Sequence, residues 1–340
     1  MQFHDYHTHF QVMRHRDRNN PAVSKGASVF YDGYLRDLNR IYNRGGKEMA
    51  GFDPFTPLLM QLQRDWHEAE RPYYNLWPSI IPALSKLRLD ADSSFFRLPL
   101  DQLLLRFPVA DNPLTWQDPQ GKTWGVRVVL AQNIGMHTDA DGTAVKFYKT
   151  QGDFVHAVGE KRGMAFWIDI GEAVDVDPLR PNDPAGQVHS LLYKHVICEP
   201  GKTIEWSFEN MTNHWSSDMG VAYPDSLVKD VARLVCTLCL MSEDKALVEP
   251  IVLKADEEKW ESTGDMTLVD KAKRRGNYGF NVGRDIEVAP HVRSASPAAL
   301  YWTGVGRKVP KIRFRRGSVV HRKRMAQVPT GFLDKEKGND

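Results

Sequence analysis

From Phe95 to Phe208, the apolar residues of this chain fall into short runs separated by glycine and proline. Runs of this length that are bounded by turn residues are typical of β-strands rather than helices. The segments that best fit a strand are 124–130, 144–148, 164–170, 188–197 and 203–208. We therefore expect a central antiparallel or mixed sheet of at least five strands.

Helical spacing of apolar residues occurs on both sides of this region. It predicts N-terminal helices at 34–42, from Asp53-Pro54 onward, and at 79–87, and a longer helix at 225–241. The expected fold class is α+β, with a helical N-terminal part packed on the central sheet. The expected divisions are a helical region at 1–94, the sheet with helix 225–241 at 95–253, a polar linker at 254–287, a basic C-terminal module at 288–333 and a tail at 334–340.

The segment 288–333 differs from the rest of the chain in its charge. It contains ten Lys or Arg residues and no Asp or Glu, whereas the whole chain has a net charge of +2, so the remaining residues carry −8. Such an asymmetry predicts a basic module on a mildly acidic body, with a polyanion or an acidic partner as its ligand. A solvated basic edge strand is the alternative, because Lys and Arg at a sheet edge discourage aggregation.

Within the basic module, apolar and basic residues alternate as they do along a strand. Ile312 and Phe314 would lie on one face. The other face would carry Lys311, Arg313 and Arg315. A turn at Gly317 would complete a basic β-hairpin. Alternate residues of a strand are about 7 Å apart, close to the phosphate spacing of a nucleic-acid strand.

The N-terminal hexapeptide Asp5–Phe10 reads DYHTHF. It resembles the opening of metal-dependent hydrolases of the amidohydrolase and polymerase-and-histidinol-phosphatase types, in which a strand ends in His-x-His. Alternate residues of a strand point the same way, so His7 and His9 could hold one metal ion. No second ligand motif and no repeated strand–helix pattern follows. We therefore expect no metal at this pair and keep a hydrolase as an alternative.

Other sequence features argue against further metal or cofactor sites. The acidic residues that follow one predicted strand, from Asp169 to Asp177, are more typical of a loop than of a metal site. Cys236 and Cys239 lie in an apolar helical run, so we expect buried thiols there rather than zinc ligands. No Walker motif, Gly-x-Ser-x-Gly elbow or kinase signature is present, and no cofactor is expected. The N-terminus lacks the apolar core of a signal peptide and no apolar run could span a membrane, which predicts a cytoplasmic protein.

The C-terminal third contains an ordered set of short motifs. They are Pro290-His291-x-Arg293, Tyr301-Trp302-x-Gly304-x-Gly306, Lys311–Phe314 and Val319-Val320. This order resembles the C-terminal part of the type V-A anti-CRISPR inhibitors that repress synthesis of the effector nuclease, and a set of uncharacterised proteins of plasmids, phages and other mobile elements. The resemblance covers about residues 225–325. It departs from the inhibitors at 294–299, where they have a His- and Arg-rich run.

The resemblance implies a non-enzymatic accessory protein of a mobile genetic element. Its partner would be RNA rather than DNA, or a nascent polypeptide at the ribosome. Besides the hydrolase, a second alternative to this function is a plasmid or phage DNA-binding accessory protein. The candidate binding residues are His291, Arg293, Tyr301, Trp302, Arg307, Lys308, Lys311, Arg313, Arg315, Arg316 and Arg322.

Overall fold

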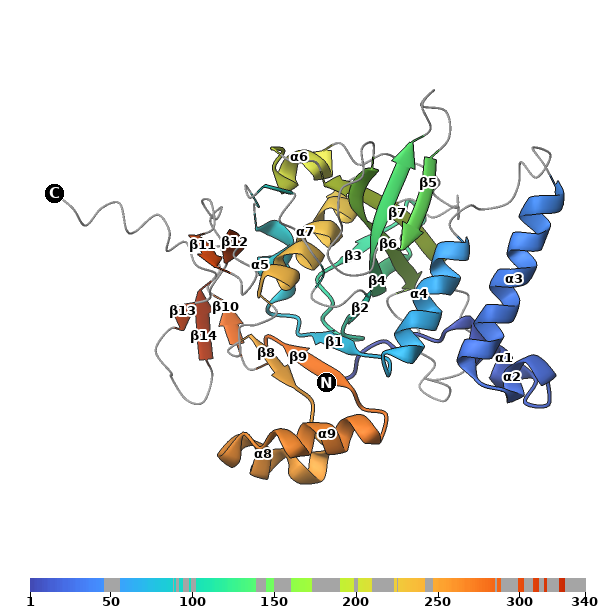
Figure 1. The fold of residues 1–340 in the computed structure, drawn as a ribbon. Coiled ribbons are helices and arrows are strands. Elements are labelled where there is room, and N and C mark those ends of the chain that lie inside the picture. The colour runs from blue at the N-terminus through green and yellow to red at the C-terminus, as the bar shows by residue number, and fades with distance from the viewer. Residues whose placement is uncertain are drawn as a thin grey trace.

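In a computed structural model, the protein has an α+β fold with a mixed sheet between two layers of helices (Figure 1). The structure describes residues 1–45, 56–87, 89, 92–93, 98, 102–138, 145–149, 160–172, 190–198, 201–209, 223–224, 226–241, 247–284, 286–288, 299–302, 308–311, 315–316 and 324–327. The expected α+β class and central sheet are confirmed, and the sheet is mixed. No helix in these ranges is both long and apolar enough to cross a membrane.

The central sheet has nine strands. Its order is β7 (Ser190–Cys198), β6 (Glu160–Glu172), β4 (Thr123–Thr138), β2 (Gln102–Arg106), β1 (Tyr73–Leu76), β9 (Gly279–Val282) and β8 (Val248–Pro250), with β3 (Thr115–Gln117) and β5 (Val145–Lys149) also paired to β4. Strand β1 is parallel to β2 and β9. The other pairs in this sheet are antiparallel.

Alternate residues of the strands pack into two different cores. In β2, Leu103 and Leu105 belong to one core and Leu104 to the other. The first core is closed by α5 (Ile81–Lys86), α6 (Ile204–Glu209) and α7 (Ser226–Met241). The second is closed by α1 (His9–Arg16), α2 (Pro21–Ser24), α3 (Ala27–Gly45) and α4 (Thr56–Glu68). The N-terminal helices therefore pack on the sheet as expected, while helices cover its other face as well.

The helices predicted from spacing are present with shifted ends. The segment 34–42 lies inside α3, and the segment 79–87 contains α5. The helix expected from Asp53-Pro54 is described from Thr56 onward, and those two residues lie outside the described ranges.

Two segments that were expected to be strands are helices. Thr8 caps α1 in a reciprocal capping box with Gln11, so His9 is a helical residue rather than the end of a strand. Thr203 starts α6 by accepting a hydrogen bond at Oγ1 from the backbone N–H of Trp206, at 3.1 Å. In both cases a threonine side chain satisfies N–H groups that a helix leaves open at its first turn. The strand predictions at these two places were therefore wrong.

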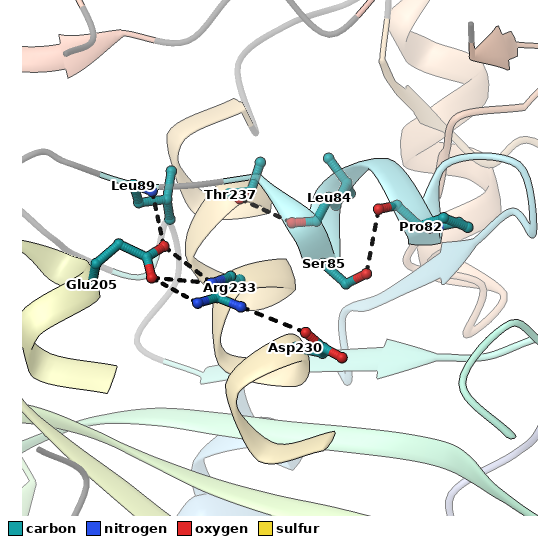
Figure 2. A network of polar contacts seen from close by, with 8 residues as sticks. All are labelled: Pro82, Leu84, Ser85, Leu89, Glu205, Asp230, Arg233 and Thr237. Carbon is teal, nitrogen blue, oxygen red and sulfur yellow. Dashed lines mark hydrogen bonds and ion pairs between the residues drawn. The ribbon is translucent and has the colours of Figure 1, made fainter. Parts of the chain in front are cut away.

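Helix α6 is fixed to α7 by the ion pair between Glu205 and Arg233 (Figure 2). Arg233 donates from Nη2 to Glu205 Oε2 at 2.7 Å, and Glu205 Oε1 also accepts from the backbone N–H of Leu89 at 3.0 Å. On the next turns of α7, Thr237 donates to the carbonyl of Leu84 in α5. The side chain of Cys236 is fully buried in this layer, whereas Cys239 is half-buried.

The segment assigned to a polar linker, 254–287, contains a short 3-10 helix (Lys254–Asp256), α8 (Glu257–Thr263), α9 (Met266–Arg274) and β9. Because β9 lies between β1 and β8, this part of the segment belongs to the central sheet. Two smaller sheets follow: β10 (Ile286–Val288), β14 (Arg324–Gln327) and β13 (Arg315–Arg316) in one, and β11 (Ala299–Trp302) with β12 (Lys308–Lys311) in the other.

Candidate functional site

Six of the eleven candidate binding residues lie in described strands. Tyr301 and Trp302 are in β11, Lys308 and Lys311 in β12, and Arg315 and Arg316 in β13. The antiparallel register places Trp302 opposite Lys308. The other candidates, His291, Arg293, Arg307, Arg313 and Arg322, lie outside the described residues, as do Ile312, Phe314 and Gly317 of the expected hairpin.

The imidazole of His9 is held by an amide. Its Nδ1 lies 3.2 Å from Oε1 of Gln63, and the same oxygen accepts from the backbone N–H of His9 at 3.1 Å. His7 precedes the helix cap, so the pair does not have the alternation of a strand. Within the described ranges, no group of three or more His, Cys, Asp or Glu side chains is arranged to hold a metal ion. The geometry required for the hydrolase alternative is therefore not formed by the described residues.

Gln63 is the centre of a buried hydrogen-bond layer beneath α1. It accepts a hydrogen bond from the hydroxyl of Tyr31 at 2.9 Å and donates one to the hydroxyl of Tyr6. Burial raises the pKa of Tyr31 to about 12, and it lowers the pKa of the nearby His67 to about 4. Both groups are therefore neutral at pH 7, and the hydrogen bonds of Tyr31 and Gln63 join α3 to α4 beneath α1.

A row of polar side chains crosses the sheet below the N-terminal segment. Arg106 pairs in register with Asn75, and its guanidinium binds the carbonyl of His4 and the carboxylate of Asp5. His4 itself is buried, and burial together with the charge of Arg127 lowers its pKa to about 4. This row therefore ties the first residues of the chain to β2.

The acidic residue Asp169 belongs to the same row. Its carboxylate accepts a hydrogen bond from Nη2 of Arg127 at 2.8 Å, and its side chain is only 2% exposed. Arg127 lies where the register between β4 and β6 shifts, at a β-bulge. The carboxylate of Asp169 is thus engaged in an ion pair with Arg127.

A basic pocket lies where α1, α2 and the start of α3 meet. Its volume is about 700 Å³, which is within the range of small-molecule sites. It is lined by Phe10, Gln11, Arg14, His15, Arg18, Val23, Ser24 and Gly26. Phe10 and Val23 are buried, whereas the three basic residues are exposed. None of the described residues that line it is Asp or Glu.

Local sequence explains why the pocket forms. Basic residues occupy the last turn of α1, where the helix dipole favours cations. Asn20 then caps α2 by accepting from the N–H of Ala22, and Gly26 turns the chain into α3 with a φ of +98°, which favours glycine. The sequence alone did not predict this pocket. The cluster of Arg14, His15 and Arg18 was visible, but its juxtaposition with Gly26 depends on the two turns.

No protein-family model, no curated protein and no solved structure matches the chain. The residues of the chain and their placement in the fold are therefore the guide to its function.

Proposed function

We propose that the protein is a non-enzymatic accessory protein of a mobile genetic element, similar to the type V-A anti-CRISPR inhibitors, and that it binds RNA through the segment 288–333. The observation that carries the proposal is the presence of ten Lys or Arg residues and no acid in this segment. Cations in such a density neutralise phosphates and release their counterions, which supplies most of the affinity for a nucleic-acid backbone.

The backbone pairing of β11 with β12 supports RNA as the ligand. It joins the strand that contains Tyr301 and Trp302 to the strand that contains Lys308 and Lys311. Aromatic and basic residues on adjacent strands are the combination that single-stranded RNA sites use, because unpaired bases stack on aromatic rings while cations bind the backbone. Double-stranded DNA offers no unpaired bases to stack, so RNA is the better partner.

A direct test compares the parent with the charge-reversal variant K311E/R313E/R315E. The logarithm of the affinity for a single-stranded RNA should fall with the logarithm of salt concentration, and the variant should flatten this slope by about two to three units. The matched control is K254E/R274E/R275E, which reverses three exposed charges on the α8–α9 region and should leave RNA binding unchanged.

The remaining ligands are outcomes of the same experiment. Tighter binding of duplex DNA than of RNA would replace the proposal by the DNA-binding alternative. Equal RNA binding by the parent and by the folded charge-reversal variant would reject the nucleic-acid proposal. In that case, binding of a nascent-chain peptide by the parent alone would identify a peptide partner.

A further inference from the structure

Among the described residues, the basic pocket formed by α1, α2 and α3 is lined by no residue of the segment 288–333 and by no Asp or Glu. No ion pair joins Arg14 or Arg18 to a carboxylate of the described residues. The nearest acid in the sequence, Asp17, accepts a hydrogen bond from the backbone N–H of Asn19 at 3.1 Å and does not line the pocket. Two guanidinium groups therefore line one cavity to which the described lining residues contribute no negative charge.

The amide of Gln11 adds a neutral donor. Its Oε1 accepts hydrogen bonds from the backbone N–H and from the hydroxyl of Thr8, at 2.9 and 3.1 Å. This fixes the orientation of the amide, since Nε2 could not accept these bonds. The N–H groups of Nε2 therefore remain for a ligand that accepts hydrogen bonds.

Gly26 lines the cavity and immediately precedes the first turn of α3. The carbonyl of Gly26 accepts from the N–H of Phe30, so the N–H groups of Ala27, Ser28 and Val29 form the open first turn of this 19-residue helix. The first turn contains no acidic residue. A Cβ built at Gly26 meets no atom within 4 Å, so the approach to this turn is open. These donors supplement the arginines rather than define the site alone.

The floor of the pocket is apolar. Phe10 is 6% exposed and Val23 4% exposed, and both line the cavity below the basic rim. A cavity of about 700 Å³ exceeds the space needed for a bare phosphate ion, so its size and floor suit a phosphate that bears an organic group. Guanidinium groups bind phosphate by pairs of charge-assisted hydrogen bonds, which makes arginine the usual residue at such sites.

We infer that this pocket binds a nucleoside monophosphate, with Arg14 and Arg18 on the phosphate and the nucleoside over Phe10 and Val23. The ligand is either a free nucleotide or the phosphorylated 5′ end of an RNA, which present the same chemistry. The inference goes beyond the proposed function, because it uses other residues and does not require the segment 288–333.

Isothermal titration of the full-length protein with adenosine monophosphate tests the inference. The parent should show saturable binding to one site, and adenosine should bind at least tenfold more weakly because it lacks the phosphate. The variant R14Q/R18Q should lose at least tenfold in affinity, since each arginine provides a charge-assisted hydrogen bond. Inorganic phosphate should compete with the nucleotide, but more weakly, because it makes no contact with the floor.

The control variant is R16Q/R36Q. Arg16 lies in the same last turn of α1 as Arg14, and Arg36 lies on α3, but neither lines the pocket. This variant removes the same amount of charge and should bind the nucleotide like the parent. If Arg14 serves only to offset the helix dipole, R14Q/R18Q and R16Q/R36Q should lose a similar amount of thermal stability, and neither should change the affinity for the nucleotide. That result would overturn the inference. Absence of saturable binding to the parent would also overturn it.

One further measurement distinguishes a free nucleotide from an RNA 5′ end as the ligand. A second distinguishes this inference from the proposed RNA binding by the segment 288–333. A 5′-phosphorylated RNA that competes with the nucleotide better than its 5′-hydroxyl counterpart assigns the pocket to RNA ends, and equal competition assigns it to free nucleotides. The variant K311E/R313E/R315E should bind the nucleotide like the parent. Loss of RNA binding in that variant and loss of nucleotide binding in R14Q/R18Q therefore report independently.

Discussion

Nη2 of Arg127 and Oδ1 of Asp169 lie 2.8 Å apart across β4 and β6, and both side chains are largely withdrawn from water. Removing one partner of a buried ion pair leaves the other charge uncompensated. We expect Asp169→Asn to lower the free energy of unfolding by about 3 kcal/mol. Asp32→Asn, which removes the half-exposed partner of Arg64, should cost less than about 1 kcal/mol. Urea unfolding of the three proteins gives the comparison, and equal losses would show that burial does not strengthen the Asp169 pair.

Substitution by alanine should change the free energy of unfolding in opposite directions at two glycines. A Cβ at Gly279 would overlap the ring of Tyr73 on the neighbouring strand, whereas a Cβ at Gly33, inside α3, meets no atom within 4 Å. We expect Gly279→Ala to lower the free energy of unfolding by about 2 kcal/mol through overpacking. Gly33→Ala should raise it by about 0.5 kcal/mol, since alanine restricts the unfolded chain and favours helix. Thermal unfolding under identical conditions checks both signs.

The free energy of unfolding should fall as the pH drops below the pKa of a free histidine side chain. The pKa of His67 is lowered by burial from 6.5 to about 4, so between these values the unfolded state binds a proton that the folded state does not. The stabilisation is therefore complete above pH 6.5 and is lost toward pH 4. Between pH 7 and pH 5, this one group should cost about 2 kcal/mol.

His67→Gln provides the test, because an amide can still bond to the hydroxyl of Thr8, which lies 2.9 Å from Nε2 of His67. The unfolding free energy of this variant should decrease by about 2 kcal/mol less than that of the parent between pH 7 and pH 5. His4, whose pKa is also lowered to about 4, should give a similar result when replaced by Gln. An unchanged pH dependence in both variants would contradict the assignment of these imidazoles as buried and neutral.

The thiol of Cys236 should react slowly in the folded protein. Its side chain is fully buried on α7, and burial raises the pKa of the thiol, which disfavours the reactive thiolate. In a C198S/C239S background, alkylation by iodoacetamide at pH 8 should be at least about a hundredfold slower for the native protein than in urea. Equal rates would place this face of α7 in contact with solvent.

Patterns of apolar residues predicted the elements whose stability comes from burial. The spacing of Leu227, Val231 and Leu234 identified α7, and all three are buried. The strand expected at 124–130 corresponds to part of β4, although the strand extends to Thr138. Such patterns report which residues face a core, but they do not report how far a strand continues past it.

Side-chain hydrogen bonds explain the errors. The alternation in His7-Thr8-His9 suggested a strand, yet the hydroxyl of Thr8 and the amide of Gln11 form a capping box that begins a helix. At Thr203 the same type of cap converts an apolar run into α6. The basic pocket was not predicted, because its walls come from three helices whose relative positions depend on the turns at Asn20 and Gly26.

The place of β9 in the sheet has a consequence for how the chain is made. Nδ2 of Asn75 in β1 donates a hydrogen bond to Oδ1 of Asn281 in β9, and these two residues are 206 positions apart. During synthesis, the edge of β1 that pairs with β9 therefore stays unpaired until most of the chain has left the ribosome. An unpaired strand edge is a template for aggregation. Truncation before Gly279 should yield an insoluble product, whereas truncation after Val288 keeps every strand of the nine-stranded sheet. The basic segment 288–333 follows β9 in the sequence, so it emerges when every strand of this sheet has already been made.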